Sequence, residues 1–248
     1  MTQISVIIPT LNEESNIRRA LDSVFFADEI IVIDSFSTDA TVAIVKEYDV
    51  RLLQRNFDDF SSQKNYAIEQ ASHDWILVID ADEEVTKELR ESIQKAITTP
   101  LNFSGFKIHR KNFIKNKKLN YGGFTDKIIR LFKKEHGYYE GIVHEKVMIT
   151  EKVGVLNGDL HHYTYKDYFQ FKNKVEYYAE LRAKELYDKG ETVNLFHRYL
   201  KPVIRFCIHY FIKLGFLDGK NGFIFSYLMA YGVYKRFDKL KTLKQIKE

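Results

Sequence analysis

The first hundred residues alternate between short apolar runs and longer stretches with helical periodicity. Mostly apolar runs cover residues 4–8, 29–33, 50–53 and 75–79. Val, Ile and Leu dominate these runs, which have the length of strands buried on both faces of a parallel sheet. Between them, apolar positions recur every three or four residues, as in helices that pack on a sheet. Strand alternating with helix four times predicts an α/β fold, a three-layer sandwich around a mainly parallel sheet.

Polar residues that favour helix N-termini precede these helical stretches. Asn12 precedes the first stretch, and Ser61 and Ser62 stand at the start of the third. We therefore expect Asn12 and one of the two serines to act as N-caps.

The pattern changes beyond residue 100. Shorter runs with partial alternation cover residues 105–110, 127–133, 143–149 and 153–156, and a long helical pattern covers 167–189. The shorter runs predict a mixed or antiparallel extension of the sheet. We expect the last of them to end in a turn at Asn157-Gly158.

Charge is divided unevenly along the chain. Its 248 residues carry a net charge of +4, but residues 200–248 hold ten Lys/Arg against three Asp/Glu, or +7. The first 199 residues carry the difference, −3. We predict a core over residues 1–165 and a basic, aromatic helical region over 166–248. The single cysteine, Cys207, excludes an internal disulfide and leaves too few thiols for a zinc cluster.

A cluster of carboxylates follows the buried run at 75–79, namely Asp80, Asp82, Glu83 and Glu84. Ligands bind just beyond the carboxyl ends of strands in open α/β sheets. Hard divalent ions such as Mg²⁺ and Mn²⁺ prefer oxygen ligands and are often shared with a substrate phosphate. The cluster therefore indicates either a metal-diphosphate site or a solvated acidic turn before a helix.

Three nucleotide-binding motifs are missing from the sequence. The segment after the first run is P-T-L-N-E-E-S-N, which lacks the glycines of a dinucleotide-binding G-x-G-x-x-G. The phosphate-binding G-x-x-x-x-G-K-[ST] is also absent. The Gly- and Arg-rich loop of sugar-1-phosphate nucleotidyltransferases is missing as well.

Four segments at compatible spacing are P-T-L-N-E-E, V-I-D-S-F-S-T-D-A-T, S-Q-K-N-Y-A and D-W-I-L-V-I-D-A-D-E. Together they resemble the family 2 inverting glycosyltransferases of the GT-A fold. More narrowly, they are similar to the subgroup that adds a hexose to the lipopolysaccharide inner core. The resemblance covers residues 3–165, and G-F-L-D-G-K-N-G at 215–222 also resembles that subgroup. It implies a GT-A-type sandwich with a mixed, mainly parallel sheet and a C-terminal helical appendage. Residues 1–100 would form the donor-binding half of the core and residues 101–165 the acceptor half.

The resemblance also implies a UDP-sugar donor, with UDP-glucose the first choice, and assigns its nucleoside-binding residues. Thr10, Leu11 and Glu13 match the segment that contacts base and ribose, and Glu13 could equally be a first-turn helix carboxylate. Asp34 matches the acceptor for the uracil N3–H. Its alternative role is a hydrogen bond to the backbone before the next helix.

A divalent cation, Mg²⁺ or Mn²⁺, is the cofactor that the resemblance implies. Asp82 would bind the metal that bridges the donor diphosphate, and Asp80 would contact the ribose or the metal. His161 and His162 follow in the second half of the core, and in some related transferases a histidine there completes the metal sphere. We take His162 as the third candidate ligand, although a lone histidine is also often structural.

Two basic residues are candidates for the donor phosphates. Lys64 lies in the Q-K-N segment and could contact the diphosphate, or it could be a solvated surface residue. Arg130 alternates with apolar residues in I-I-R-L-F. It could clamp a phosphate, but we favour an ion pair with an acid.

Inversion at an anomeric carbon needs a base that takes the proton of the acceptor hydroxyl. Glu145, in G-I-V-H-E-K-V, is the candidate because the subgroup has a similar H-E. A salt-bridged structural glutamate is its alternative interpretation. Glu83 and Glu84 are fallback bases.

The C-terminal region combines basic and aromatic residues without a run long enough to span a bilayer. We expect residues 200–248 to bind an anionic membrane surface, the alternatives being a helical pair packed on the core or a dimer contact. No nucleic-acid reader motif is present, so nucleic acid is not expected as a partner. No signal peptide is visible, so we expect a cytoplasmic protein peripheral to the inner membrane. The acceptor would be a saccharide or a lipid-linked saccharide.

Overall fold

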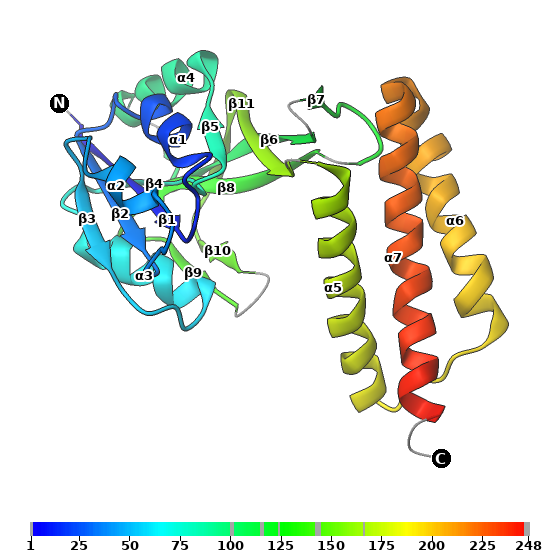
Figure 1. Cartoon of the computed structure of the whole chain (residues 1–248). Coiled ribbons are helices and arrows are strands. Elements are labelled where there is room, and N and C mark those ends of the chain that lie inside the picture. Colours follow the sequence, from blue (N-terminus) through cyan, green and yellow to red (C-terminus); the bar gives the residue numbers. More distant parts are fainter. Residues whose placement is uncertain are drawn as a thin grey trace. The chain divides into compact units, whose positions relative to one another are not determined.

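A computed structural model describes residues 2–99, 102–114, 117–123, 125–141, 145–165 and 167–245 (Figure 1). The chain forms two compact units. The sheet unit comprises Met1–Arg110 and Asp126–His162. The helical unit comprises Lys111–Thr125 and Tyr163–Glu248.

The main sheet has the strand order β3-β2-β1-β4-β8-β6-β11-β5. Its strands are β1 (Ile4–Thr10), β2 (Glu29–Asp34), β3 (Arg51–Gln54), β4 (Trp75–Val78), β5 (Glu83–Val85), β6 (Gly105–Ile114), β8 (Thr125–Lys133) and β11 (Val153–Tyr165). β1, β2, β3 and β4 pair in parallel, whereas β8 pairs antiparallel with β4 and β5 antiparallel with β11. The predicted mixed sheet, parallel in its first half, is therefore confirmed.

Two short elements complete the strands. β7 (Lys117–Lys118) pairs with β6. β9 (Tyr138–Glu140) and β10 (Lys146–Met148) form a separate antiparallel ribbon. The strand predicted over 143–149 falls partly on residues 142–144, which lie outside the described residues.

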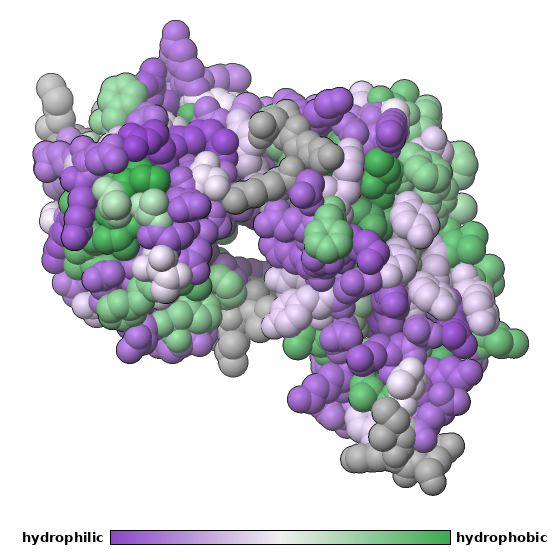
Figure 2. Space-filling view, in the orientation of Figure 1, coloured by the Kyte–Doolittle hydropathy of each residue, from purple (hydrophilic) through white to green (hydrophobic). Residues whose placement is uncertain are grey.

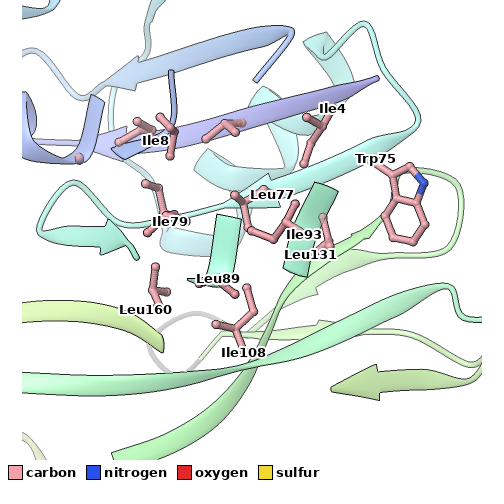
Figure 3. Packing of buried hydrophobic residues seen from close by; sticks show 14 of the residues in the cluster. Ile4, Ile8, Trp75, Leu77, Ile79, Leu89, Ile93, Ile108, Leu131 and Leu160 are labelled. Atoms are coloured by element: carbon pink, nitrogen blue, oxygen red, sulfur yellow. The ribbon is translucent and has the colours of Figure 1, made fainter. Parts of the chain in front are cut away.

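Helices cover both faces of the parallel strands, because side chains along a strand alternate between faces. Ile4, Val6 and Ile8 of β1 join a core with α1 (Ile17–Ser23), α2 (Thr41–Val45) and α4 (Lys87–Thr98). Figure 3 shows Leu89 and Ile93 of α4 beside the side chains of β1 and β4. Ile7 points to the other face, where α3 (Phe60–Gln70) packs. This is the predicted three-layer arrangement.

The helical unit is built from three long helical segments. α5 (Tyr168–Asp188) confirms the helix predicted over 167–189, and Asp167 caps it by accepting the N–H of Gln170 at 2.7 Å. α6 (Lys201–Cys207) lies between two π-helical turns, Phe196–Leu200 and Ile208–Ile212. A 3₁₀ turn (Gly215–Asp218) leads into α7 (Gly219–Gln245). No helix among the described residues is long and apolar enough to cross a membrane.

The predicted N-caps are wrong for the first and third helices. Asn12 has a left-handed backbone, and its side chain accepts the N–H of Thr38 at 2.8 Å instead of capping α1. Asp59, not a serine, caps α3 by accepting the N–H of Ser62 at 2.9 Å.

The turn predicted at Asn157-Gly158 is also wrong, because both residues lie inside β11. Gly158 has φ +85°, and a Cβ there would lie 2.3 Å from the backbone nitrogen of Leu89. A glycine therefore lets the strand pass close to α4 and continue to the histidines.

Candidate active site

The loops after β1 and β2 are bound to each other by hydrogen bonds. The N–H of Asn12 donates to Ser37 Oγ at 2.9 Å, and the N–H of Glu13 donates to Thr41 Oγ1 at 2.8 Å. The contact between Asn12 and Thr38 adds a third link. These two motif segments, separate in sequence, form one fixed edge at the carboxyl ends of the parallel strands.

The three residues predicted to contact base and ribose begin at this edge. Thr10 is buried, and its Oγ1 has no hydrogen-bond partner among the described residues. Leu11 is 48% exposed, so it offers an apolar surface to a ligand. Glu13 accepts a hydrogen bond from Asn16 at 2.7 Å, which favours the helix-start role that we left open.

Asp34 is fully buried at the end of β2. It accepts the N–H and the hydroxyl of Ser37, and Gln54 Nε2 donates to it at 3.1 Å. This is the alternative role expected from sequence. The N–H of Ser37 is also 3.2 Å from the other carboxylate oxygen, so each oxygen of Asp34 has two donors.

Five charged side chains form a buried ionic network beyond β4. Lys64 Nζ lies 3.2 Å from Asp80 Oδ1 and 2.8 Å from Glu145 Oε1. Arg130 pairs with Asp80 and lies 2.9 Å from Glu83 Oε1. The Lys64 side chain is 2% exposed and that of Arg130 6%, so neither is a solvated surface residue.

The network shifts the pKa values of its members. Burial alone would favour neutral Asp80, but Arg130 and Lys64 hold the pKa of this carboxyl well below its usual range. Burial also opposes charge on Arg130, yet Asp80 and Glu83 raise the pKa of its guanidinium. For Glu83 burial dominates and raises the pKa. Arg130 thus pairs with acids, the role that we favoured, and Glu83 is held inside the network.

Three residues of this region were missed by the sequence analysis. Arg110 Nη1 lies 3.5 Å from Glu83, and its Nη2 lies 2.7 Å from Asp126. The Tyr139 ring lies 5.0 Å from Lys64 Nζ. A basic residue within the strand run 105–110 was a signal for Arg110, whereas nothing in the sequence marks Tyr139.

Asp82 and His162 meet although 80 positions separate them. Antiparallel pairing of β5 with β11 places His162 opposite Glu83 and His161 opposite Glu84. His162 Nε2 then lies 3.2 Å from Asp82 Oδ2. Burial opposes charge on His162, but the hydrogen bond with Asp82 raises its pKa.

Asp82 and His162 are the residues that could hold a divalent cation. A carboxylate oxygen and an imidazole nitrogen are ligand types that Mn²⁺ accepts, and Mg²⁺ accepts the oxygen. Asp80 is less suited, because Lys64 and Arg130 both pair with it. No group of three or more acidic, histidine or cysteine side chains poised for metal occurs in the described part of the chain. Phosphate and water would have to complete the sphere.

Residues 5–148 match the family model described as glycosyl transferase family 2. An uncharacterized glycosyltransferase of Rickettsia typhi is 30% identical over 98% of this chain and 88% of its own length. The lipopolysaccharide core biosynthesis glycosyltransferase LpsC of Rhizobium meliloti is 27% identical over 94% of this chain and 92% of its own. A crystal structure of S. aureus TarS 1–349 in complex with UDP-GlcNAc aligns over 99% of this chain and 91% of that one, with 17% identity and a TM-score of 0.48.

Proposed function

Because the chain belongs to glycosyl transferase family 2 and has its GT-A fold, we propose a specific reaction for it. The enzyme transfers a hexose, with glucose the first candidate, from a UDP-sugar to a lipid-linked or lipopolysaccharide core saccharide. The transfer inverts the anomeric centre and depends on a divalent cation. Similarity to LpsC supports this class of acceptor.

The observation that carries the proposal is the position of Lys64 between Asp80 and Glu145. Asp80 follows the strand that ends at the donor side, whereas Glu145 comes from the second half of the core. A single buried ammonium therefore fixes both carboxylates. Glu145 is 19% exposed, so its second oxygen, Oε2, can reach an acceptor hydroxyl. Fixing a base in this way is what positions it for proton transfer.

The remaining candidates other than Glu13 have roles on the donor side. Thr10 and Leu11 contact the nucleoside, and Asp34 accepts the uracil N3–H in place of one of its present donors. Asp82 and His162 hold the cation, which would neutralise the charge of the departing diphosphate. Arg130 acts indirectly, because it holds Asp80 in place.

The displacement then needs one proton transfer from the acceptor. The hydroxyl of the acceptor gives its proton to Glu145 as its oxygen bonds to the anomeric carbon. The bond between that carbon and UDP breaks on the opposite side, so the configuration inverts. The products are the extended saccharide and UDP.

A donor screen tests this function directly. The purified protein is incubated with a panel of UDP-sugars, Mg²⁺ or Mn²⁺ and extracted lipid-linked saccharide, and UDP is measured. We expect UDP release with one donor and its loss on chelation or in Asp82→Asn. Release of pyrophosphate or UMP would instead indicate nucleotidyl or phosphoglycosyl transfer. Function that survives both Asp82→Ala and Glu145→Ala would indicate a catalytically silent assembly factor.

An enzyme with a lipid-linked acceptor must work at a membrane. We propose that it sits at the cytoplasmic face of the inner membrane and that residues 200–248, with their excess of positive charge, bind anionic lipid. Sedimentation with anionic liposomes is the corresponding measurement.

A further inference from the structure

The segment 196–212, which contains α6, exposes a row of large apolar side chains. We call this row the outer face of α6, and its members are Phe196, Leu200, Val203, Ile204, Phe211 and Ile212. They are between 41% and 73% exposed. Their spacing of three to four residues over much of the segment puts them along one side of the helix. Figure 2 shows hydrophobic residues, in green, gathered along the edge of the helical unit where α6 lies.

Some of the basic residues of the same segment contact α7 instead of water. Arg198 Nη2 lies 2.6 Å from Asp238 Oδ1, and Lys201 Nζ lies 5.1 Å from the centre of the Phe237 ring. His209 is buried, and its ring lies 5.5 Å from that of Phe225. All three partners belong to α7.

This arrangement differs from the usual amphipathic pattern of a helix in water. Such a helix buries its apolar stripe against the core and exposes its charged side. Soluble monomers rarely expose a contiguous apolar patch larger than a few hundred Å². The outer face of α6 therefore indicates apolar surroundings on that side of the helix.

Charge identifies those surroundings. Between residues 192 and 237 the sequence has seven Lys/Arg and a single acid, Asp218. The carboxylate of Asp218 already accepts the backbone N–H groups of Asn120 and Tyr121. Arg205, Lys213 and Lys220 are exposed. A second copy of the chain would bring the same positive charge, whereas an anionic lipid surface complements it.

We propose that α6 lies in the plane of an anionic membrane interface, with its outer face among the lipid headgroups and upper acyl chains. Helices that bury one apolar side in this way bind without crossing the bilayer. The proposal narrows the membrane-binding region from residues 200–248 to the outer face of α6. It rests on the proposed function, in which the acceptor is lipid-linked.

Vesicle flotation of the full chain tests the proposal. The outer-face variant carries Leu200→Ser, Val203→Ser, Phe211→Ser and Ile212→Ser. The control variant carries Phe169→Ser, Tyr177→Ser and Leu181→Ser, which replace residues of α5 that are 69%, 60% and 43% exposed. With phosphatidylglycerol-containing vesicles we expect the outer-face variant to lose about tenfold or more in binding, since each 1.4 kcal/mol is tenfold. The control variant should bind like the wild type.

A fluorescent reporter with one substitution tests the proposal even if the outer-face variant, which has four substitutions, fails to fold. Trp75 is the only tryptophan and is buried, so Ile212→Trp adds one responsive probe. Its emission should shift to the blue with anionic vesicles and stay unchanged with neutral ones. An unchanged emission in both would overturn the proposal.

Two further results would also decide against it. Equal vesicle binding by the outer-face and control variants would place the contact elsewhere. The other result is a wild-type protein that is a dimer and does not bind vesicles, together with an outer-face variant that is a monomer. The outer face of α6 would then be a contact between copies of the chain. UDP release can be measured in every variant with an acceptor that is solubilised in detergent. This assay does not require membrane binding, so it tests the proposed function separately from the proposed membrane contact.

Discussion

The buried ionic network shows what single charged residues contribute. Taking charges out of water is so unfavourable that buried ion pairs rarely add net stability, but removing one partner leaves the other uncompensated. Arg130 faces two carboxylates, Asp80 and Glu83, and its own side chain is 6% exposed. The network is therefore best understood as a device that holds Asp80 in position.

Replacing Arg130 tests this interpretation. We expect Arg130→Met to lower the free energy of unfolding by about 3–5 kcal/mol, because two carboxylates lose their cation. Urea unfolding measures the change. The matched control is Arg55→Met, which removes a half-exposed pair with Asp58 and should change stability by about 1 kcal/mol or less. Equal effects of the two substitutions would contradict the argument.

The proposed role of Glu145 as a base can be tested separately from its contact with Lys64. Glu145→Gln keeps an oxygen for Lys64 but cannot accept a proton at neutral pH. We expect kcat to fall about 10²–10⁴-fold with little change in KM for the donor. Steady-state UDP release measures both constants. Glu140→Gln, at an exposed carboxylate of β9, is the control and should stay near wild type. A Glu145→Gln enzyme of normal kcat would assign the base elsewhere.

At the scale of elements, apolar runs in the sequence predicted the strands correctly, whereas polar segments did not. β1, β2 and β4 lie where continuous apolar runs predicted them, because such runs have few other places to be buried. β5 begins with two glutamates, and its conformation comes from pairing with β11. That pairing is also what joins Asp82 to His162, so spacing along the chain could not reveal it.

The misplaced caps have a similar origin. Asn12 has the chemistry of a cap, but the loop after β2 supplies the N–H of Thr38, and this tertiary bond prevails over the local one. Family resemblance at the four motif segments supplied the candidate donor-side residues. The segments did not give Arg110 or Tyr139, whose side chains enter the network through the sheet and the β9 ribbon.

The segment G-F-L-D-G-K-N-G has a packing role in the helical unit. A Cβ on Gly222 would lie 1.8 Å from the carbonyl oxygen of Gly215, so the start of α7 has room only for glycine there. We expect Gly222→Ala to destabilise the protein by about 3 kcal/mol, the upper end for overpacking. Thermal unfolding measures this. Gly190→Ala is the control, since its Cβ would meet nothing within 4 Å and only its φ of +74° adds strain. A smaller loss in Gly222→Ala than in this control would refute the packing argument.

On the scale of the whole molecule, the division into units depends on contacts that the sequence does not show. Residues 111–125 were expected in the core, but this segment belongs to the helical unit. Asp218 accepts the N–H groups of Asn120 and Tyr121, and the N–H of Gly122 donates to Lys213 O at 2.8 Å. These contacts span more than ninety positions in sequence.

Separate cores lead to a prediction about unfolding. The sheet unit has its own buried clusters around β1 and β4, and the helical unit has others around Phe225 and Phe237. The proposed donor-side residues all lie in the sheet unit. We therefore expect calorimetry to resolve two unfolding transitions. UDP with Mn²⁺ should raise the midpoint temperature of only one of them.

The size of the shift follows from mass action. Ligand at a hundred times its dissociation constant stabilises the state that binds it by about 2.7 kcal/mol. For a unit of this size that corresponds to roughly 5–10 °C. Asp82→Asn should remove most of the shift while leaving both transitions in place, because the substitution removes a candidate metal ligand and not a core residue. If both transitions moved together with ligand, the two units would not unfold independently.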